Sequence, residues 1–295
     1  GSPRELVRLA TPAGLDAGAL VTEQVSARSR DGTDIPIFLV HRRDLRPTGD
    51  VPTVLTGYGG FNVSRTPSYV AGAALWAESG GLYALANLRG GGEFGERWHR
   101  DGMLERKQNV FDDFHAAATH LVESGWTRPA RLGALGGSNG GLLMGAALTQ
   151  RPELFGAIVC AVPLLDMLRY QNMLIARFWI AEYGSAEDPA QYRWLRAYSP
   201  YHNVREGVRY PPVLLTTAEG DSRVDPMHAR KMAALLQSLP APDGAAPPLV
   251  LLRVDRDAGH GIGKPVRLQV DDAADLWSFL ADRLGLAPHR AEPLQ

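Results

Sequence analysis

The stretch Arg131-Leu-Gly-Ala-Leu-Gly-Gly-Ser-Asn-Gly-Gly-Leu-Leu-Met144 decides how this chain folds. Its apolar start, residues 132–135, predicts a short strand, and the small and aliphatic residues after the glycines predict a helix to about Gln150. Gly136-x-Ser138-x-Gly140 matches the pattern of a serine held on a sharp turn between a strand and a helix. Glycines let the two elements pass closely, so the turn lifts the hydroxyl above the sheet edge. A glycine-rich loop at this place can also bind phosphate, so the role of Ser138 depends on whether a base and an orienting acid lie further along the chain.

Length and composition describe an ordinary globular protein. The chain has 295 residues, 45% apolar and 21% charged, so one large domain or two small ones are possible. A net charge of −1 gives no reason to expect a nucleic acid or an anionic membrane as a partner. No run of about 18 apolar residues and no signal peptide is visible, which favours a cytoplasmic location, and the start at Gly1-Ser2 suggests a trimmed or engineered end. The single cysteine, Cys160, is expected to fill the core.

Strand-like and helix-like segments alternate along the chain. Apolar and β-branched runs predict strands at 21–29, 34–41, 51–56, 82–88, 132–135, 157–162, 212–218 and 249–254. Helical spacing predicts helices at about 70–79, 110–122, 226–239 and 265–284, besides the one after Ser138. Asn109 is the expected N-cap of the second of these helices, and Gly125 its expected end. The alternation indicates an α/β fold with a mostly parallel central sheet covered by helices on both faces.

Other segments have different patterns. Asp31-Gly32 between the first two strands predicts a hairpin. Residues 164–205 are rich in aromatic residues and arginine without a strand signal, and we expect them to form helices laid over the upper edge of the sheet. Residues 1–20 predict an irregular lead-in and 288–295 a frayed tail, which leaves 21–287 as one folded domain.

A base for the serine is found near the end of the chain. A serine hydroxyl is a poor nucleophile until a base takes its proton, and a third group must orient that base. His260 lies in a short glycine-rich loop, 258–263, between the last strand and the last helix, which suits that role. Structural roles are expected for the other histidines that we considered: His99, His115, His120 and His228.

The expected orienting acid is Asp221, which ends a loop directly after a strand. Glu219 is the competing acid, and Asp225 is the expected N-cap of the next helix. Ser138, Asp221 and His260 then have the chain order of the α/β-hydrolase fold. Each comes after a strand, and the carboxyl ends of parallel strands meet at one edge of a sheet. The sequence therefore predicts a serine hydrolase that needs no metal or cofactor.

Seven ordered stretches of the chain resemble one family of serine peptidases. They are Asp31-Gly-Thr-Asp-Ile-Pro36, Gly57-Tyr-Gly-Gly-Phe-Asn62, Asn87-Leu-Arg-Gly-Gly-Gly-Glu-Phe-Gly95, Lys107-Gln-Asn-Val-Phe-Asp-Asp-Phe114, Gly136-Gly-Ser-Asn-Gly-Gly141, Tyr198-Ser-Pro-Tyr-His-Asn203 and Gly259-His-Gly-Ile-Gly-Lys-Pro265. Residues 21–285 are similar to the catalytic domain of the prolyl oligopeptidase family. The resemblance implies hydrolysis of peptide bonds on the carboxyl side of proline, in short peptides, through an acyl-enzyme.

The resemblance also implies roles for individual residues. Ser138 would attack the scissile carbonyl, His260 would carry the proton and Asp221 would orient His260. The residues that would bind the oxyanion are Tyr58, through its hydroxyl, and Asn139, through its backbone N–H. The residues that would bind substrate are Trp179, stacked on the proline ring, Arg223, on a peptide carbonyl, and Phe61, Leu164, Tyr183 and Val224, which would line the proline pocket. Aromatic residues of this kind also serve as core, and Arg223 also suits a surface ion pair.

The family normally carries a β-propeller that caps the active site, whereas these 295 residues hold only the hydrolase domain. The chain is therefore expected to be a fragment, one piece of a cut chain, or a form without the cap. Two other functions stay open at this point. One is an esterase or aminoacyl-peptide hydrolase with a broader pocket, and the other is an inactive hydrolase-like binding module.

Overall fold

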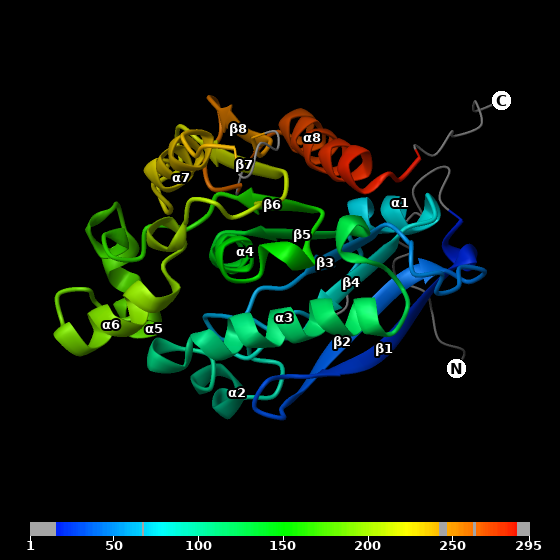
Figure 1. Ribbon diagram of the computed structural model, residues 1–295, viewed down its shortest axis with the longest axis horizontal. Helices are drawn as coiled ribbons and strands as arrows, with labels where there is room; N and C mark the ends of the chain where they lie inside the picture. Colours follow the sequence, from blue (N-terminus) through cyan, green and yellow to red (C-terminus); the bar gives the residue numbers. More distant parts are fainter. Residues whose placement is uncertain (1–15, 67, 242–246, 262–263, 288–295) are drawn as a thin grey trace, which may run out of the picture.

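A single eight-stranded sheet organises the computed structural model, which describes residues 16–66, 68–241, 247–261 and 264–287 (Figure 1). The strands lie in the order β1-β2-β4-β3-β5-β6-β7-β8. Their bounds are β1 Leu20–Arg28, β2 Asp34–Arg42, β3 Thr53–Thr56, β4 Leu82–Ala86, β5 Leu132–Gly137, β6 Ala157–Ala161, β7 Val213–Ala218 and β8 Val250–Asp255. The pairs β1–β2 and β2–β4 are antiparallel and all the others parallel, so the predicted α/β fold with a mostly parallel sheet is confirmed.

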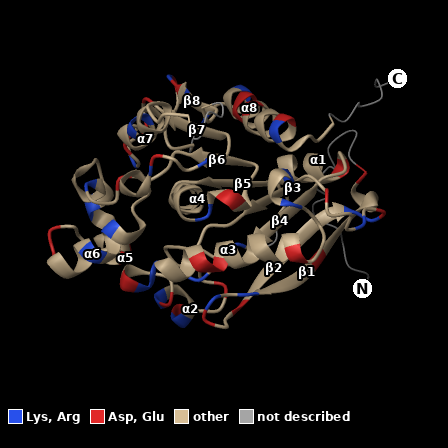
Figure 2. Cartoon of the chain, viewed as in Figure 1, with Lys and Arg blue, Asp and Glu red and all other residues tan. Residues whose placement is uncertain are grey.

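Helices cover both faces of the sheet (Figure 1). On one face, α1 (Ala71–Glu78) packs against β2 and β4, and α8 (Val266–Leu284) packs against β5 and β6. On the other, α3 (Gln108–Glu123), α4 (Asn139–Gln150) and α7 (Met227–Gln237) pack against the strands from β1 to β8. In the view of Figure 2, basic and acidic residues are interspersed over the peripheral helices. In the described part of the chain, no helix combines the length and the apolar composition that a membrane crossing requires.

The two faces of the sheet bury two separate apolar clusters. In β6, Ile158 and Cys160 belong to the larger cluster under α3, α4 and α7, and Val159 between them belongs to the smaller cluster under α1 and α8. Alternate residues of a strand point to opposite faces, which explains why a strand covered on both faces is apolar throughout. Cys160 is fully buried, and burial raises the pKa of its thiol well above the usual range, so it fills the core as expected.

Residues 164–205 cover the carboxyl edge of the sheet with short helices, as expected. They comprise η5 Tyr170–Asn172, η6 Ala176–Trp179, α5 Ile180–Tyr183, α6 Pro189–Tyr198 and η7 Pro200–Asn203. In Figure 1, α5 and α6 lie on the left, beyond the strand ends. A second group of short helices, α2 (Glu96–Arg100) and η2 (Leu104–Arg106), comes after the loop that leaves β4.

Some local expectations were wrong. α3 begins at Gln108, and the side chain of Asn109 donates to the backbone oxygen of Asp101 (2.8 Å) instead of capping the helix. β5 continues to Gly137, two residues past the expected end, because Gly136 and Gly137 still pair with β6. A 3-10 turn at Ala17–Ala19 (η1) and the start of β1 at Leu20 shorten the irregular lead-in. The rest of that lead-in, 1–15, and the predicted tail, 288–295, lie outside the described residues.

We predict that Gly136→Ala lowers the free energy of unfolding by about 2 kcal/mol or more. A Cβ at residue 136 would lie 2.4 Å from the backbone oxygen of Gly140, where β5 turns into α4. Gly137→Ala is the matched control, because a Cβ one residue further along meets its nearest atom, the backbone oxygen of Ala161, at 3.5 Å. Chemical denaturation of both variants measures the difference, and equal losses would contradict the steric explanation.

Candidate active site

Ser138 occupies a strained turn between β5 and α4. Its backbone has φ 58° and ψ −119°, a left-handed conformation that residues with a Cβ rarely adopt and that costs on the order of 1–3 kcal/mol. The N–H of Ser138 donates to the backbone oxygen of Ala161 (2.9 Å), which holds the turn against the end of β6. Gly141 allows this close approach, since a Cβ there would lie 2.6 Å from the Cα of Pro163. The hydroxyl is therefore held beyond the end of the strand.

The structure brings Ser138, His260 and Asp221 together from three different loops. His260 Nε2 lies 3.0 Å from Ser138 Oγ, and His260 Nδ1 lies 2.7 Å from Asp221 Oδ2. The other carboxylate oxygen of Asp221 accepts from the backbone N–H groups of Arg223 and Val224, each at 2.9 Å. Asp221 is buried, so these contacts fix its side chain in one orientation.

The charge of Asp221 decides which nitrogen of His260 carries a proton. Burial raises the pKa of Asp221, but the hydrogen bonds from His260 and from the two backbone N–H groups outweigh it, and the net shift is downward. An ionised carboxylate can only accept, so the proton of a neutral imidazole lies on Nδ1. The lone pair on Nε2 then faces the Ser138 hydroxyl, which is the arrangement that a general base requires.

The two other acids considered in this loop have different partners. Glu219 is half-exposed and forms an ion pair with Arg230 (2.6 Å). Asp225 lies one residue before Pro226, which is the N-cap of α7 in place of the expected Asp225, and its side chain accepts from the backbone N–H of Met227 (2.9 Å). Asp221 is therefore the acid of this loop that meets His260.

Tyr58 and Asn139 both lie next to Ser138. Burial raises the pKa of the Tyr58 phenol above its usual value, although a hydrogen bond with Ser138 and the charge of Arg223 act in the other direction. The hydroxyl thus keeps its proton at neutral pH and can donate it. Asn139 is the first residue of α4, where a backbone N–H has no acceptor within the helix and lies at its positive end. Both groups are suited to bind a developing negative charge.

The structure brings three of the residues expected to bind the proline ring into contact. The ring of Phe61 meets Trp179 and Tyr183 edge-on, with centroids 6.2 and 5.4 Å apart. Phe61 and Trp179 are partly exposed. Leu164, Tyr183 and Val224 have at most 3% of their surface exposed, so they offer no open face to a ligand in this structure. Tyr183 packs against Phe61, and its hydroxyl donates to Asn139 Oδ1 (2.7 Å), which fixes the ring.

Arg223 is exposed beside this group. Its positive charge acts to lower the pKa of the Tyr58 phenol, against the larger effect of burial. The alternative role in a surface ion pair has no support in the described part of the chain, where Arg223 has no carboxylate within ion-pair distance.

Sequence reasoning missed the polar residues behind Tyr58. The side chains of Lys107 and Glu182 are almost completely buried and 3.2 Å apart. His99, for which a structural role was expected, lies 2.8 Å from Glu182 through Nε2. The signal that could have found Lys107 is composition, since it is one of only three lysines in an arginine-rich chain.

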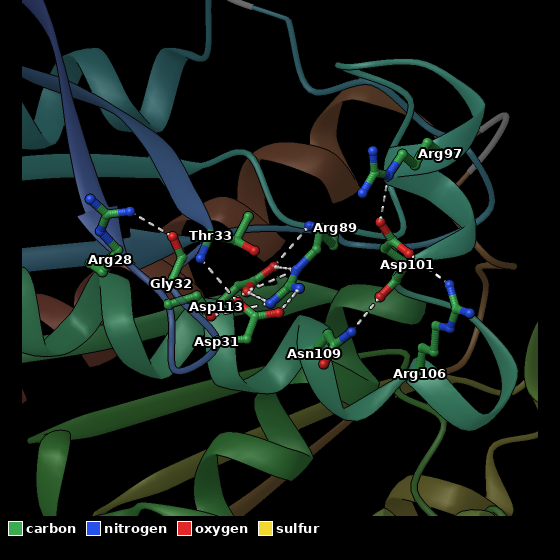
Figure 3. Close-up of polar contacts among 11 residues, drawn as sticks. Arg28, Asp31, Gly32, Thr33, Arg89, Arg97, Asp101, Arg106, Asn109 and Asp113 are labelled. Atoms are coloured by element: carbon green, nitrogen blue, oxygen red, sulfur yellow. Dashed lines mark hydrogen bonds and ion pairs between the residues drawn. The ribbon is translucent and has the colours of Figure 1, made fainter.

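The loop after β4, which packs against the Tyr58 loop, is anchored by Arg89 (Figure 3). The buried guanidinium donates from Nε to Asp113 (2.9 Å) in α3, and it also forms an ion pair with Asp31 in the turn of the β1–β2 hairpin. The hydrogen bond from Arg89 lowers the pKa of Asp31 to about 2. One side chain thus ties the hairpin, α3 and the glycine-rich loop 89–95 together.

Comparison with known proteins assigns this arrangement to a family. Residues 67–287 match the model described as "Prolyl oligopeptidase family". An uncharacterized peptidase, y4nA, of Sinorhizobium fredii is 51% identical over 79% of this chain and 32% of its own length. A prolyl endopeptidase of Elizabethkingia miricola is 42% identical over 90% of this chain and 37% of its own length. A structure from a structural and mechanistic study of two prolyl endopeptidases has a TM-score of 0.88 and 53% identity, over 91% of this chain and 39% of that one. The chain spans about a third of the length of these curated relatives.

We predict that the free energy of unfolding falls as the pH is lowered from about 7 to about 5. Burial lowers the pKa of both His115 and His228 to about 4, whereas a histidine in the unfolded chain titrates near 6.5. Between these pH values the unfolded chain binds more protons than the folded chain. The contribution of each histidine to the free energy of unfolding is therefore fully present above about pH 6.5, and below that pH it falls by up to about 1.4 kcal/mol per pH unit.

His228→Asn tests the assignment. His228 Nδ1 accepts from the backbone N–H groups of Leu165 (3.2 Å) and Asp166 (3.0 Å), which requires a neutral ring. Whatever the substitution costs at pH 7, the slope of unfolding free energy against pH between 7 and 5 should become smaller. Urea denaturation at several pH values measures it, and an unchanged slope would show that His228 does not contribute.

Proposed function

The chain belongs to the prolyl oligopeptidase family of serine peptidases, and from that premise we propose that it hydrolyses peptide bonds on the carboxyl side of proline in short peptides. The observation that carries the proposal is the continuous line of hydrogen bonds from Asp221 through His260 to Ser138. A buried carboxylate, an imidazole with one defined tautomer and a hydroxyl on a strained turn are the parts that acyl transfer from a peptide requires.

In the first half of the reaction, Ser138 Oγ attacks the scissile carbonyl carbon while His260 Nε2 takes the hydroxyl proton. The carbonyl oxygen becomes an oxyanion, which accepts hydrogen bonds from the Tyr58 hydroxyl and the Asn139 N–H. His260 then gives the proton to the leaving amine as the C–N bond breaks, and an ester on Ser138 remains. Asp221 stays ionised and stabilises the imidazolium, as its lowered pKa favours.

In the second half, water takes the place of the amine. His260 removes a proton from the water, the hydroxide oxygen adds to the ester carbonyl, and the same two donors bind the oxyanion. Collapse of this intermediate breaks the ester bond, returns the proton to Ser138 Oγ and releases the peptide with a new carboxyl end after proline.

The proline preference rests on Trp179 and Phe61. A flat indole with a partly exposed face can stack on a pyrrolidine ring, and the edge-on Phe61 supplies a second apolar wall. Arg223, exposed beside Tyr58, would hold a carbonyl oxygen of the bound peptide. We propose Leu164, Tyr183 and Val224 as the support of this pocket.

A fluorophosphonate probe tests the nucleophile. The wild-type chain should be labelled at Ser138 and should cleave a Gly-Pro amide, and Ser138→Ala should abolish labelling and lower kcat by about 10⁴-fold or more. Intact-mass spectrometry and release of the amide chromophore are the measurements. Folded wild-type protein that is neither labelled nor active would favour a binding module over a peptidase.

Trp179→Ala should lower kcat/KM for a Gly-Pro amide by about tenfold, and lower it less for a Gly-Ala amide, because the lost face binds the ring. Trp126→Ala is the matched control, since Trp126 packs on His41 far from Ser138, and it should leave the ratio of the two rates unchanged. If the wild-type chain cleaves a Gly-Arg amide faster than a Gly-Pro amide, the proline pocket is wrongly assigned.

A further inference from the structure

A buried ion pair lies directly behind the loop that carries Tyr58. The side chains of Lys107 and Glu182 are 1% and 6% exposed, and Lys107 Nζ lies 3.2 Å from Glu182 Oε1. Lys107 precedes α3, and Glu182 lies in α5, within the segment that covers the sheet edge. Burying two charges is costly, and an apolar pair of the same size is often as stable or more so, so such a pair calls for a role besides stability.

Both charges are bonded to the backbone of the Tyr58 loop. Lys107 Nζ donates to the backbone oxygen of Gly59 (2.9 Å), and Glu182 Oε1 accepts from the N–H of Phe61 (3.0 Å). From the other side, Asn139 Nδ2 donates to the backbone oxygen of Tyr58 (2.5 Å). The backbone polar groups of Tyr58, Gly59 and Phe61 are thus each bonded to a side chain from a different part of the chain.

The loop needs these contacts because its own conformation is unfavourable. Gly59 has φ 62°, Phe61 has φ 57° and Asn62 has φ 55°, and the last two have a Cβ in the left-handed region. Strained backbone of this kind persists only where the surroundings determine it. Gly59 has no room for a side chain, since a Cβ there would lie 2.3 Å from Val110 Cγ1, so the loop is pressed onto α3 near Lys107.

The geometry points to Lys107 and Glu182 as positioning residues for the oxyanion donor Tyr58, an inference that rests on the function proposed above. The pair fixes the backbone of residues 59 and 61, and thereby the direction in which the Tyr58 hydroxyl points. Glu182 also joins this loop to the covering segment, because it is the residue before Tyr183 and three after Trp179. One ion pair thus sets the oxyanion donor and the substrate-binding rings relative to each other.

Two observations separate positioning from a direct part in the chemistry. Among the described residues, the carboxylate of Glu182 contacts Phe61, Lys107 and His99. The ammonium of Lys107 contacts Gly59 and Glu182, and it lies 5.2 Å from the centroid of the Tyr183 ring. These partners lie in the wall of the site, and none of them is Ser138, His260 or Asp221. With a substrate that does not use the rings, the pair therefore acts on the reaction through the backbone of the loop that carries Tyr58.

A double-mutant cycle tests this, with the turnover of a simple p-nitrophenyl ester by the 295-residue chain as readout. Glu182→Gln keeps an acceptor for Phe61 and removes the charge, and kcat should fall by about 10- to 100-fold with less than about threefold change in KM. Tyr58→Phe removes the donor and should lower kcat by about 10²- to 10³-fold. In the double variant the losses should not multiply, and kcat should equal that of Tyr58→Phe alone. Losses that multiply would overturn the inference.

Controls distinguish positioning from loss of structure. Asp50→Asn removes the ion pair with Arg131, before the amino end of β5, and should lower stability without changing kcat. Lys107→Arg keeps the charge and should retain more of kcat than Lys107→Met, a rescue that a purely steric role would not give. Thermal unfolding of each variant verifies that it is folded, and Lys107→Met takes the place of Glu182→Gln in the cycle if Glu182→Gln does not fold.

The ester readout separates this inference from the proposed function. Acyl transfer from an ester needs Ser138 and the oxyanion donors but not a proline pocket. Failure of the proposed function would appear in the wild-type chain, as no labelling of Ser138 or as a preference for arginine over proline. Failure of the inference would appear only in the variants, as multiplying losses in an active enzyme.

Discussion

The steric constraint at residues 136–141 is the feature on which the rest of the site depends. Ser138 is held at φ 58° where β5 turns into α4 against neighbouring backbone: a Cβ at residue 136 would lie 2.4 Å from Gly140 O, and one at residue 141 would lie 2.6 Å from Pro163 Cα. The hydrogen bond from Ser138 N to Ala161 O locks the turn to β6. Because β5 lies in the middle of a parallel sheet, the loops after β6, β7 and β8 end beside the same hydroxyl.

Around this rigid turn, the charged groups of the site are arranged in two layers with different tasks. Asp221 faces His260 and sets its tautomer, so it acts on the reacting atoms through one imidazole. Lys107 and Glu182 face backbone instead, and hold a loop whose own conformation is unfavourable. Arg89 anchors its loop through the carboxylates of Asp113 and Asp31. A hydrophobic core cannot do this, because an apolar side chain leaves a buried carbonyl or N–H without a partner, at a cost of about 1–3 kcal/mol each.

The sequence was sufficient for the fold and for the residues nearest the chemistry, because both are encoded locally. Alternating apolar runs predict strands and helices, and Ser138, Asp221 and His260 each come after a strand in a short loop. Features that depend on distant partners were not accessible in this way. Asn109 has the sequence pattern of a helix cap, but in the folded chain its side chain donates to the backbone oxygen of Asp101. The nearly complete burial of Leu164 and Val224 also shows only in the folded chain. Lys107 and Glu182 are 75 residues apart, and nothing in either neighbourhood shows that they meet.

The contrast between these two classes of residue has a physical basis. A nucleophile, its base and its acid must be presented at the ends of rigid elements, so the pattern of elements reveals them. Residues that position a loop can come from any segment that packs behind it, so they can be identified only once the folded structure is known. Here Glu182 joins the covering segment to the loop that carries Tyr58, so in the proposed function the segment that would bind the substrate ring also contacts the loop of the proposed oxyanion donor. In that proposal, substrate binding and charge stabilisation share one support, and a shift of α5 would affect both.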